Sequence, residues 1–248
     1  MFIDPSRRSG FAQGYDVYTA GVDVQRNGEL YCVVVGWKSG VIPTGHVLSH
    51  ACVSWQGGSF QIKWANLLQF FAPYQAALSR VALDSTDGLV SQDIFDFCNY
   101  AGRPYLPLKD STTLHLKTCI KTINPEINGK KTNRSQVVLI ANSDKIKDDL
   151  ASSFQRTPGE VGAWAFPFDV GIEFLKSLTM EHRIQDRHGK SSWCLKYSHA
   201  PNHYFSALVY ATASMEEYRV YLQSDIKKLS AQLAQKPRIA SQGISVWR

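Results

Sequence analysis

Three consecutive runs rich in β-branched and aromatic residues are joined by links that favour antiparallel pairing. The runs cover residues 18–25, 29–37 and 44–55, and the links between them read "RNG" and "KSGVIP". Short links of turn-forming residues join antiparallel neighbours, whereas a parallel return needs a connection of a dozen residues or more. The runs therefore predict a three-stranded antiparallel meander.

Alternating helical and strand patterns follow the meander. Apolar spacing predicts helices over 63–74 and 87–102, strands over 79–85 and 103–109, and then a strand over 137–141 and a helix over 143–154. Helices are also predicted over 171–184 and 199–222. Three antiparallel strands followed by helix, strand, helix and strand is the ribonuclease H-like order. The predicted fold is α/β, with a mixed sheet of antiparallel and then parallel strands flanked by helices.

Composition places most of the chain in one packed domain. The chain has 248 residues, of which 44% are hydrophobic, and no apolar run approaches the length of a membrane span. We expect residues 1–16 to be a linker or the edge of a fragment, 17–222 to form the domain, and 223–248 to be a polar tail. The five cysteines are widely spaced without a CxxC pair, which is typical of reduced, intracellular core cysteines. The net charge of +6 favours a polyanionic partner.

An aspartate interrupts the first strand, and a second aspartate ends the fourth. Asp23 lies between Val22 and Val24, and Asp84 closes the 79–85 run. A hydrogen-bonded turn aspartate would explain Asp23 and a helix cap would explain Asp84. In the ribonuclease H-like order, however, these two strands are neighbours, so the carboxylates meet at matching strand ends. Such a pair repels unless a cation lies between them, and this favours a metal site.

Several motifs extend this interpretation. "YTAGVDVQ", "LDSTDG", "IANSDKIKDDL", "PGEVGAWAFP", "FLKSLTMEHRI", "SSWCLKY" and "NHYFSALVYATA" occur in this order over about residues 17–215. The chain resembles the nuclease domain of the large terminase subunit of lambda-like tailed phages, the GpA family. The resemblance implies an endonuclease that cuts concatemeric double-stranded viral DNA in the host cytoplasm with two divalent ions, Mg²⁺ or Mn²⁺. It also implies an ATPase domain, a small terminase subunit and a portal as partners.

The resemblance leaves the third metal ligand open. The family usually carries an acid at the start of the late helix and often an aspartate three residues on, where this sequence has His203 and Ser206. His203 can bind Mn²⁺ through a ring nitrogen, so Asp23, Asp84 and His203 are the expected metal ligands and catalytic residues. Asn202 offers a neutral oxygen or caps the helix.

Other functions remain open on these residues. A non-catalytic module that docks DNA or the portal would explain the lost acid, and a junction resolvase would share the chemistry but expects a symmetric dimer. Cys194, His199 and His203 resemble half of a zinc site, without a second cysteine nearby. No GxxxxGK[ST] motif occurs, so ATP hydrolysis is not expected of this chain.

Basic residues are candidates for DNA contacts. Lys109 ends a strand where the family carries a lysine, and it could meet the scissile phosphate or simply be solvated. The residues expected to contact the duplex backbone are Lys117, Lys121, Lys130, Lys131 and Arg134, which could otherwise belong to a polar surface loop.

Overall fold

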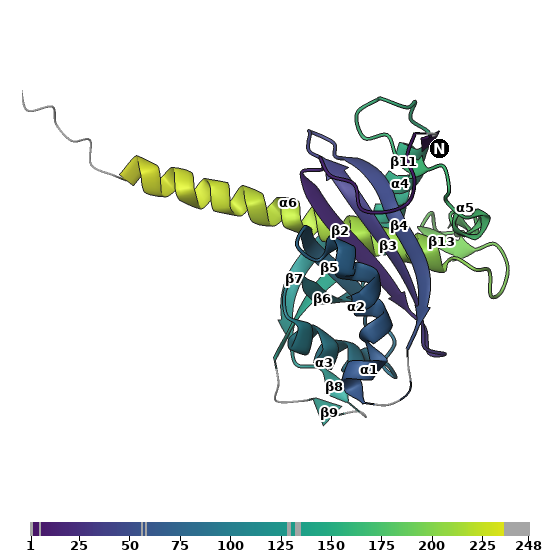
Figure 1. The fold of residues 1–248 in the computed structure, drawn as a ribbon, viewed down its shortest axis with the longest axis vertical. Coiled ribbons are helices and arrows are strands. Elements are labelled where there is room, and N and C mark those ends of the chain that lie inside the picture. Colours follow the sequence, from purple (N-terminus) through teal and green to yellow (C-terminus); the bar gives the residue numbers. More distant parts are fainter. Residues whose placement is uncertain are drawn as a thin grey trace, which may run out of the picture.

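A nine-stranded mixed sheet organises the computed structural model, which describes residues 2–4, 6–55, 57, 59–127, 130–131 and 135–235. In order across the sheet, its strands are β1 (Phe2–Asp4), β11 (Ala165–Pro167), β4 (Thr44–Ser54), β3 (Glu29–Lys38), β2 (Val17–Val24), β5 (Leu78–Asp84), β6 (Tyr105–Asp110), β10 (Gln136–Ala141) and β7 (Thr118–Ile123). This arrangement is shown in Figure 1.

The central five strands confirm the ribonuclease H-like order. β2, β3 and β4 form the predicted antiparallel meander, and β5 then pairs in parallel with β2, as β6 does with β5. All eight residues of β2 are buried, because helices cover both faces of the sheet at this strand. The first and fourth predicted strands are therefore neighbours.

Helices form a layer on each face of the sheet (Figure 1). The helices α1 (Phe60–Lys63), α2 (Ala65–Phe71), η1 (Ala72–Tyr74) and α3 (Ser91–Ala101) cover one face, and α4 (Ser143–Phe154), α5 (Ile172–Ser177) and α6 (His203–Gln235) cover the other. Trp64 and Phe97 are buried in the first layer, and Phe174 and Phe205 in the second. Both core layers are rich in aromatic rings, which supply large apolar areas for burial.

Helix α6 lies directly against the backbone of β2. A Cβ atom placed on Gly21 would lie 2.0 Å from the carbonyl oxygen of Ala207 and 2.5 Å from the nitrogen of Ala211. Only glycine allows this approach, and the small residues of α6 face it. Beyond the sheet, α6 continues to Gln235 and projects from the body (Figure 1). Among the helices of the described residues, none combines the length and apolarity that a membrane crossing needs.

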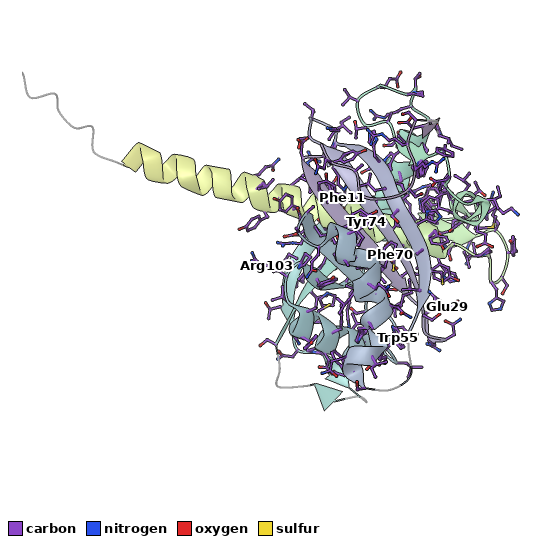
Figure 2. All side chains as sticks on the ribbon, viewed as in Figure 1. Phe11, Glu29, Trp55, Phe70, Tyr74 and Arg103 are labelled. Carbon is purple, nitrogen blue, oxygen red and sulfur yellow. The ribbon has the colours of Figure 1, made fainter. Side chains whose placement is uncertain are left out.

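The N-terminal residues, predicted to be a linker, pack on the domain. β1 pairs in parallel with β11, and the backbone N–H of Gly10 donates to the carbonyl of Leu48. The ring of Phe11 lies 5.9 Å from that of Tyr18. It lies 5.7 Å from that of Tyr74, and both of these residues are labelled in Figure 2. These residues extend the sheet and its core.

The helix predicted over 171–184 is wrong after Ser177. β12 (Glu181–Gln185) and β13 (Ser191–Leu195) form a two-stranded hairpin there. Asp186 closes its turn by accepting the backbone N–H groups of His188 and Lys190, and Gly189 adopts a φ of +81°. The turn residues and the pairing with β13 outweigh the apolar spacing that suggested a helix.

Other element boundaries also differ from the prediction. α6 starts at His203 rather than at residue 199, because His199 has a φ of +61° that a helix cannot contain. The cap of α4 is Asn142, whose side chain accepts the backbone N–H of Lys145, and not Ser143. The polar stretch 124–136 contains a small hairpin of β8 (Glu126–Ile127) and β9 (Lys130–Lys131). β7 was not predicted.

Candidate active site

Asp23 and Asp84 lie at neighbouring strand ends. Val22 pairs with Leu83 in the parallel β2–β5 ladder, so Asp23 and Asp84 are the next residue of each strand. Val22 and Leu83 belong to the core layer of α1–α3, and side chains alternate between the faces of a strand. Both carboxylates therefore face α6. The predicted strand order implied that they would be adjacent.

Asp23 is 5% exposed, and one of its oxygens is engaged twice. Oδ2 lies 2.9 Å from Nδ1 of His203 and accepts the Nε2–H of Gln25 at 2.7 Å. The imidazole of His203 stacks on the ring of Tyr31 with 4.5 Å between their centroids. Since Nδ1 of His203 is used, Nε2 is the ring nitrogen left for a metal ion. A histidine that bonds a carboxylate through one nitrogen and a metal through the other is a common arrangement.

Asp84 is held at both of its oxygens. Oδ1 accepts the backbone N–H of Thr86 at 2.9 Å, and Oδ2 accepts the hydroxyl of Tyr210 at 3.3 Å. Burial raises the pKa of Asp84 to about 6, and the charge of Asp23 adds to this rise while the hydrogen bonds of Thr86 and Tyr210 oppose it. Burial and the charges of the nearby aspartates raise the pKa of Tyr210 far above its usual value, so its hydroxyl stays a donor.

The pair fits a divalent cation. In the described part of the chain, no lysine or arginine forms an ion pair with Asp23 or Asp84, so the second negative charge has no cationic partner there. Mg²⁺ is usually bound by one or two carboxylates, with water and substrate phosphate completing its shell. Among the described residues, no group of three or more His, Cys, Asp and Glu side chains is arranged to hold a metal ion. The protein thus offers two carboxylates and not a complete cage.

Asp110 and Tyr210 join this site, and neither was predicted. Asp110 ends β6, two residues after Leu108, which pairs with Asp84. Its Oδ1 accepts the backbone N–H groups of Ser111 and Ser143 at 2.9 and 3.0 Å, which fixes the start of α4. The predicted strand stopped one residue earlier, so an acid at the end of the next parallel strand was the available signal.

A buried ion pair fixes the start of α6. Glu181 is 7% exposed. Its Oε2 forms an ion pair with Nζ of Lys147 at 2.6 Å, and its Oε1 accepts a hydrogen bond from Nδ2 of Asn202 at 2.8 Å. Asn202 directly precedes His203, so this network sets where the imidazole lies. The prediction placed Glu181 in a helix and therefore missed its role. The side-chain nitrogen of Asn202 donates to Glu181, and its backbone carbonyl accepts the backbone N–H of Ser206.

Lys109 lies on the other face of the sheet. Its Nζ is 5.8 Å from the centre of the Phe95 ring, in the layer of α3, whereas Asp84 faces α6. The structure does not bring it to the carboxylates. Asp87 forms an ion pair with Arg26 of the β2–β3 turn and accepts the backbone N–H of Leu89. It therefore connects two loops at this edge of the sheet.

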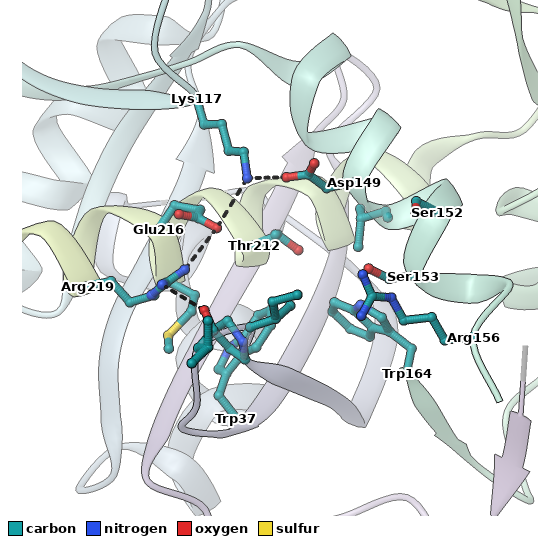
Figure 3. Close-up of a pocket in the computed structure, with 15 residues that line it drawn as sticks. Trp37, Lys117, Asp149, Ser152, Ser153, Arg156, Trp164, Thr212, Glu216 and Arg219 are labelled. Carbon is teal, nitrogen blue, oxygen red and sulfur yellow. Dashed lines mark hydrogen bonds and ion pairs between the residues drawn. The ribbon is translucent and has the colours of Figure 1, made fainter. Parts of the chain in front are cut away.

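Lys117 lies in a pocket of about 270 Å³ between α4, α6 and the β3–β4 loop (Figure 3). Its ammonium forms ion pairs with Asp149 and, at 3.8 Å, with Glu216. Glu216 also pairs with Arg219 at 3.6 Å. The charge of Lys117 is therefore balanced within the protein, which weakens its case as a phosphate contact.

The remaining predicted residues are placed less fully. Lys121 is exposed on β7. Lys130 and Lys131 form β9, but their side chains lie outside the described residues, as does all of Arg134. Cys194 lies in β13, and it does not assemble with His199 and His203 into a metal-holding group in the part of the chain that the structure describes.

One known protein family matches most of this chain. A family model described as terminase large subunit gpA, endonuclease domain, matches residues 4–226. The chain belongs to this family. No curated protein matches the chain. The gpA endonuclease family was the one that the sequence motifs indicated, and the match covers the carboxylate pair, His203 and Tyr210.

Solved structures with a similar fold are also terminases. The large terminase of a thermophilic bacteriophage, in complex with ADP, aligns with a TM-score of 0.50 at 10% identity, covering 84% of this chain and 41% of that chain. The large terminase nuclease from the thermophilic phage G20c aligns with a TM-score of 0.49 at 15% identity, covering 85% and 92%. The same G20c nuclease with bound magnesium aligns with a TM-score of 0.49 at 15% identity, covering 85% and 91%.

Proposed function

We propose that this gpA-family domain is a divalent-metal-dependent endonuclease that cuts concatemeric double-stranded DNA during viral packaging. The observation that carries this proposal is the pair of carboxylates at neighbouring parallel strand ends, the buried Asp23 and the partly buried Asp84, without a cationic partner among the described residues. Paired carboxylates are what metal-dependent phosphodiester hydrolysis requires.

Asp23 and Asp84 would hold Mg²⁺ or Mn²⁺, with two ions in the active form. Bound ions would polarise the phosphodiester and lower the pKa of the attacking water. The protein's own part is positioning: Gln25 and His203 orient Asp23, while Thr86 and Tyr210 orient Asp84. Fixed ligands reduce the reorganisation that the reaction would otherwise need.

His203 is the proposed third ligand through its Nε2 atom. Its side chain is 31% exposed and stacks on Tyr31, so the ring is both fixed and accessible. Only the neutral imidazole has a free lone pair, and an imidazole in place of the family's carboxylate favours Mn²⁺ over Mg²⁺.

Duplex DNA is proposed to contact two basic segments of the chain by its phosphates. Of the cations predicted from sequence, Lys121 lies on β7, and Lys130, Lys131 and Arg134 follow β7 in the sequence. Lys109 remains a candidate. The hairpin of β12 and β13 precedes His203 in the sequence, and exposed cations lie on its turn and just after it: Arg187, Lys190 and Lys196. Glu181 of this hairpin bonds Asn202, next to His203, and this connection makes the hairpin a candidate surface for DNA at the cleavage point.

The family places this activity in a larger packaging machine. We propose that the domain works beside a terminase ATPase domain, with the small terminase subunit and the portal as partners, in the host cytoplasm. A second candidate function is a non-catalytic module that docks DNA or the portal. His203 and Ser206 in place of acids favour this alternative, as does the absence of a three-residue metal group among the described residues.

Plasmid cleavage separates the two functions. We expect the protein to nick supercoiled plasmid in Mn²⁺, less in Mg²⁺ and not in EDTA. His203→Ala should lower the rate in both metals, and His203→Asp should retain activity and shift the preference toward Mg²⁺, because a carboxylate oxygen suits that ion. Thermal melts would show that the variants are folded. Folded wild-type protein that binds plasmid but leaves it intact in every metal would support the docking module instead.

A further inference from the structure

Helix α6 contacts both carboxylates of the proposed site. His203 reaches Asp23, and Tyr210 reaches Asp84. The two α6 residues are seven positions apart, which is about two helical turns, so they lie on one face of the helix. One rigid element therefore holds two strand ends.

Tyr210 is itself fixed by packing. Its side chain is 8% exposed, and its Cβ lies 2.8 Å from the position that a Cβ on Gly21 would take. The close contact between α6 and β2 leaves the ring little freedom to turn. A hydroxyl on a locked ring holds its partner with less loss of conformational entropy than one on a mobile side chain.

The hydrogen bond from Tyr210 to Asp84 has a specific consequence for the orientation of the carboxylate. Thr86 contacts the carboxylate through its backbone N–H, which donates to Oδ1, and through its side chain, so both contacts come from the loop that follows β5. The terminal torsion of aspartate has a broad energy profile. The hydroxyl of Tyr210 on Oδ2 adds a contact from a second element, α6, and it restrains this torsion so that the plane of the carboxylate is fixed beside Asp23.

We propose that Tyr210 is a positioning residue that holds Asp84 in the orientation in which the Asp23–Asp84 pair binds a divalent cation. This inference rests on the proposed function of the pair. It extends that function by assigning the tyrosine of the "VYA" segment to metal affinity, although Tyr210 does not itself bind the metal. Residues that orient metal ligands through hydrogen bonds typically change metal affinity about 10-fold to 100-fold when they are lost.

Tyr210→Phe tests the proposal, because it removes one oxygen and keeps the ring. Tyr204→Phe is the matched control: Tyr204 is buried in the same helix, but its ring packs against His50 and Phe174. We expect calorimetry with Mn²⁺ alone to show affinity about 10-fold or more lower for Tyr210→Phe and unchanged for Tyr204→Phe. In plasmid cleavage, Tyr210→Phe should need more Mn²⁺ for half-maximal activity and recover most of its rate at saturating Mn²⁺.

The outcomes separate a failure of the positioning role of Tyr210 from a failure of the proposed function. Equal Mn²⁺ affinity for wild type and Tyr210→Phe would overturn the positioning role, as would an equal loss in both tyrosine variants or a rate loss that saturating Mn²⁺ does not restore. A wild-type protein that neither binds Mn²⁺ nor cleaves would overturn the proposed function, and the positioning role with it. Thermal melts in EDTA would confirm that both variants fold.

Discussion

Asp84→Asn is expected to stabilise the metal-free protein at neutral pH while abolishing metal-dependent cleavage. The pKa of Asp84 rises from its ordinary value of 3.8 to about 6 in the folded protein, chiefly through burial. A carboxyl with a raised pKa holds its proton more tightly when folded, so ionisation costs folding free energy. This cost is absent below about pH 4, grows between about pH 4 and pH 6, and is complete above about pH 6.

The size of this effect follows from the pKa. A rise from 3.8 to about 6 corresponds to roughly 3 kcal/mol, and partial exposure of the site reduces this to about 2 kcal/mol. We therefore expect Asp84→Asn to melt about 4–8 °C above wild type at pH 8 in EDTA. The difference should disappear below about pH 4, and Mn²⁺ should stabilise wild type more than the variant.

Asp87→Asn provides the matched control. Asp87 lies three residues further along the chain, and its hydrogen bond with Arg26 lowers its pKa. The same substitution there removes a favourable ionised group, so it should lower stability slightly at pH 8. An Asp84→Asn protein that is less stable than wild type at pH 8 in EDTA would show that ionisation of Asp84 does not cost folding free energy. It would also remove the electrostatic argument that the pair binds a cation.

Gly21→Ala is expected to damage stability and the metal site together. The added Cβ would lie 2.0 Å from the carbonyl oxygen of Ala207 and 2.5 Å from the nitrogen of Ala211, and both are helix backbone atoms that cannot rotate away. α6 must shift, at a cost of about 1–3 kcal/mol or more. The shift moves His203 and Tyr210 away from Asp23 and Asp84.

Thermal melts and Mn²⁺ calorimetry on Gly21→Ala measure both consequences. The melting temperature should fall by several degrees, and Mn²⁺ affinity should fall by more than in Tyr210→Phe because both hydrogen bonds are affected. Gly88→Ala is the control, since a Cβ there meets nothing within 4 Å and Gly88 lies close to Asp84 in sequence. Normal Mn²⁺ affinity in Gly21→Ala would mean that α6 does not set the geometry of the pair.

Much of the central fold can be predicted from local sequence. The runs that became β2, β3 and β4 have short links, and the strand patterns of β5 and β6 follow at helix-length intervals, so the sheet order and the adjacency of Asp23 and Asp84 follow. β1 and β7 carry little pattern of their own, and they form because the sheet offers them open edges. Glu181–Gln185 was predicted as helix because its hairpin depends on a partner strand.

The surroundings of the carboxylates could not be predicted in the same way. His203 meets Asp23 across 180 residues of sequence, and Tyr210 meets Asp84 across 126. A family resemblance indicated His203. For Tyr210, the sequence shows only a tyrosine on the apolar face of a helix, and this is indistinguishable from a core residue until the packing of the helix is known. Glu181 likewise becomes informative only when Lys147 and Asn202 are seen around it. Spacing along one element identifies strands and helices, whereas hydrogen-bond partners depend on how they pack.

Anomalous scattering from crystals of this protein soaked in Mn²⁺ would test most directly whether Asp23 and Asp84 form the metal site. We expect a manganese peak between the carboxylates of Asp23 and Asp84, with His203 still in contact with Asp23 and Tyr210 still in contact with Asp84. Crystals of Asp84→Asn soaked identically should lack that peak. A wild-type crystal with no manganese between the two carboxylates, or with manganese bound only elsewhere, would contradict the assignment of this pair as the metal site.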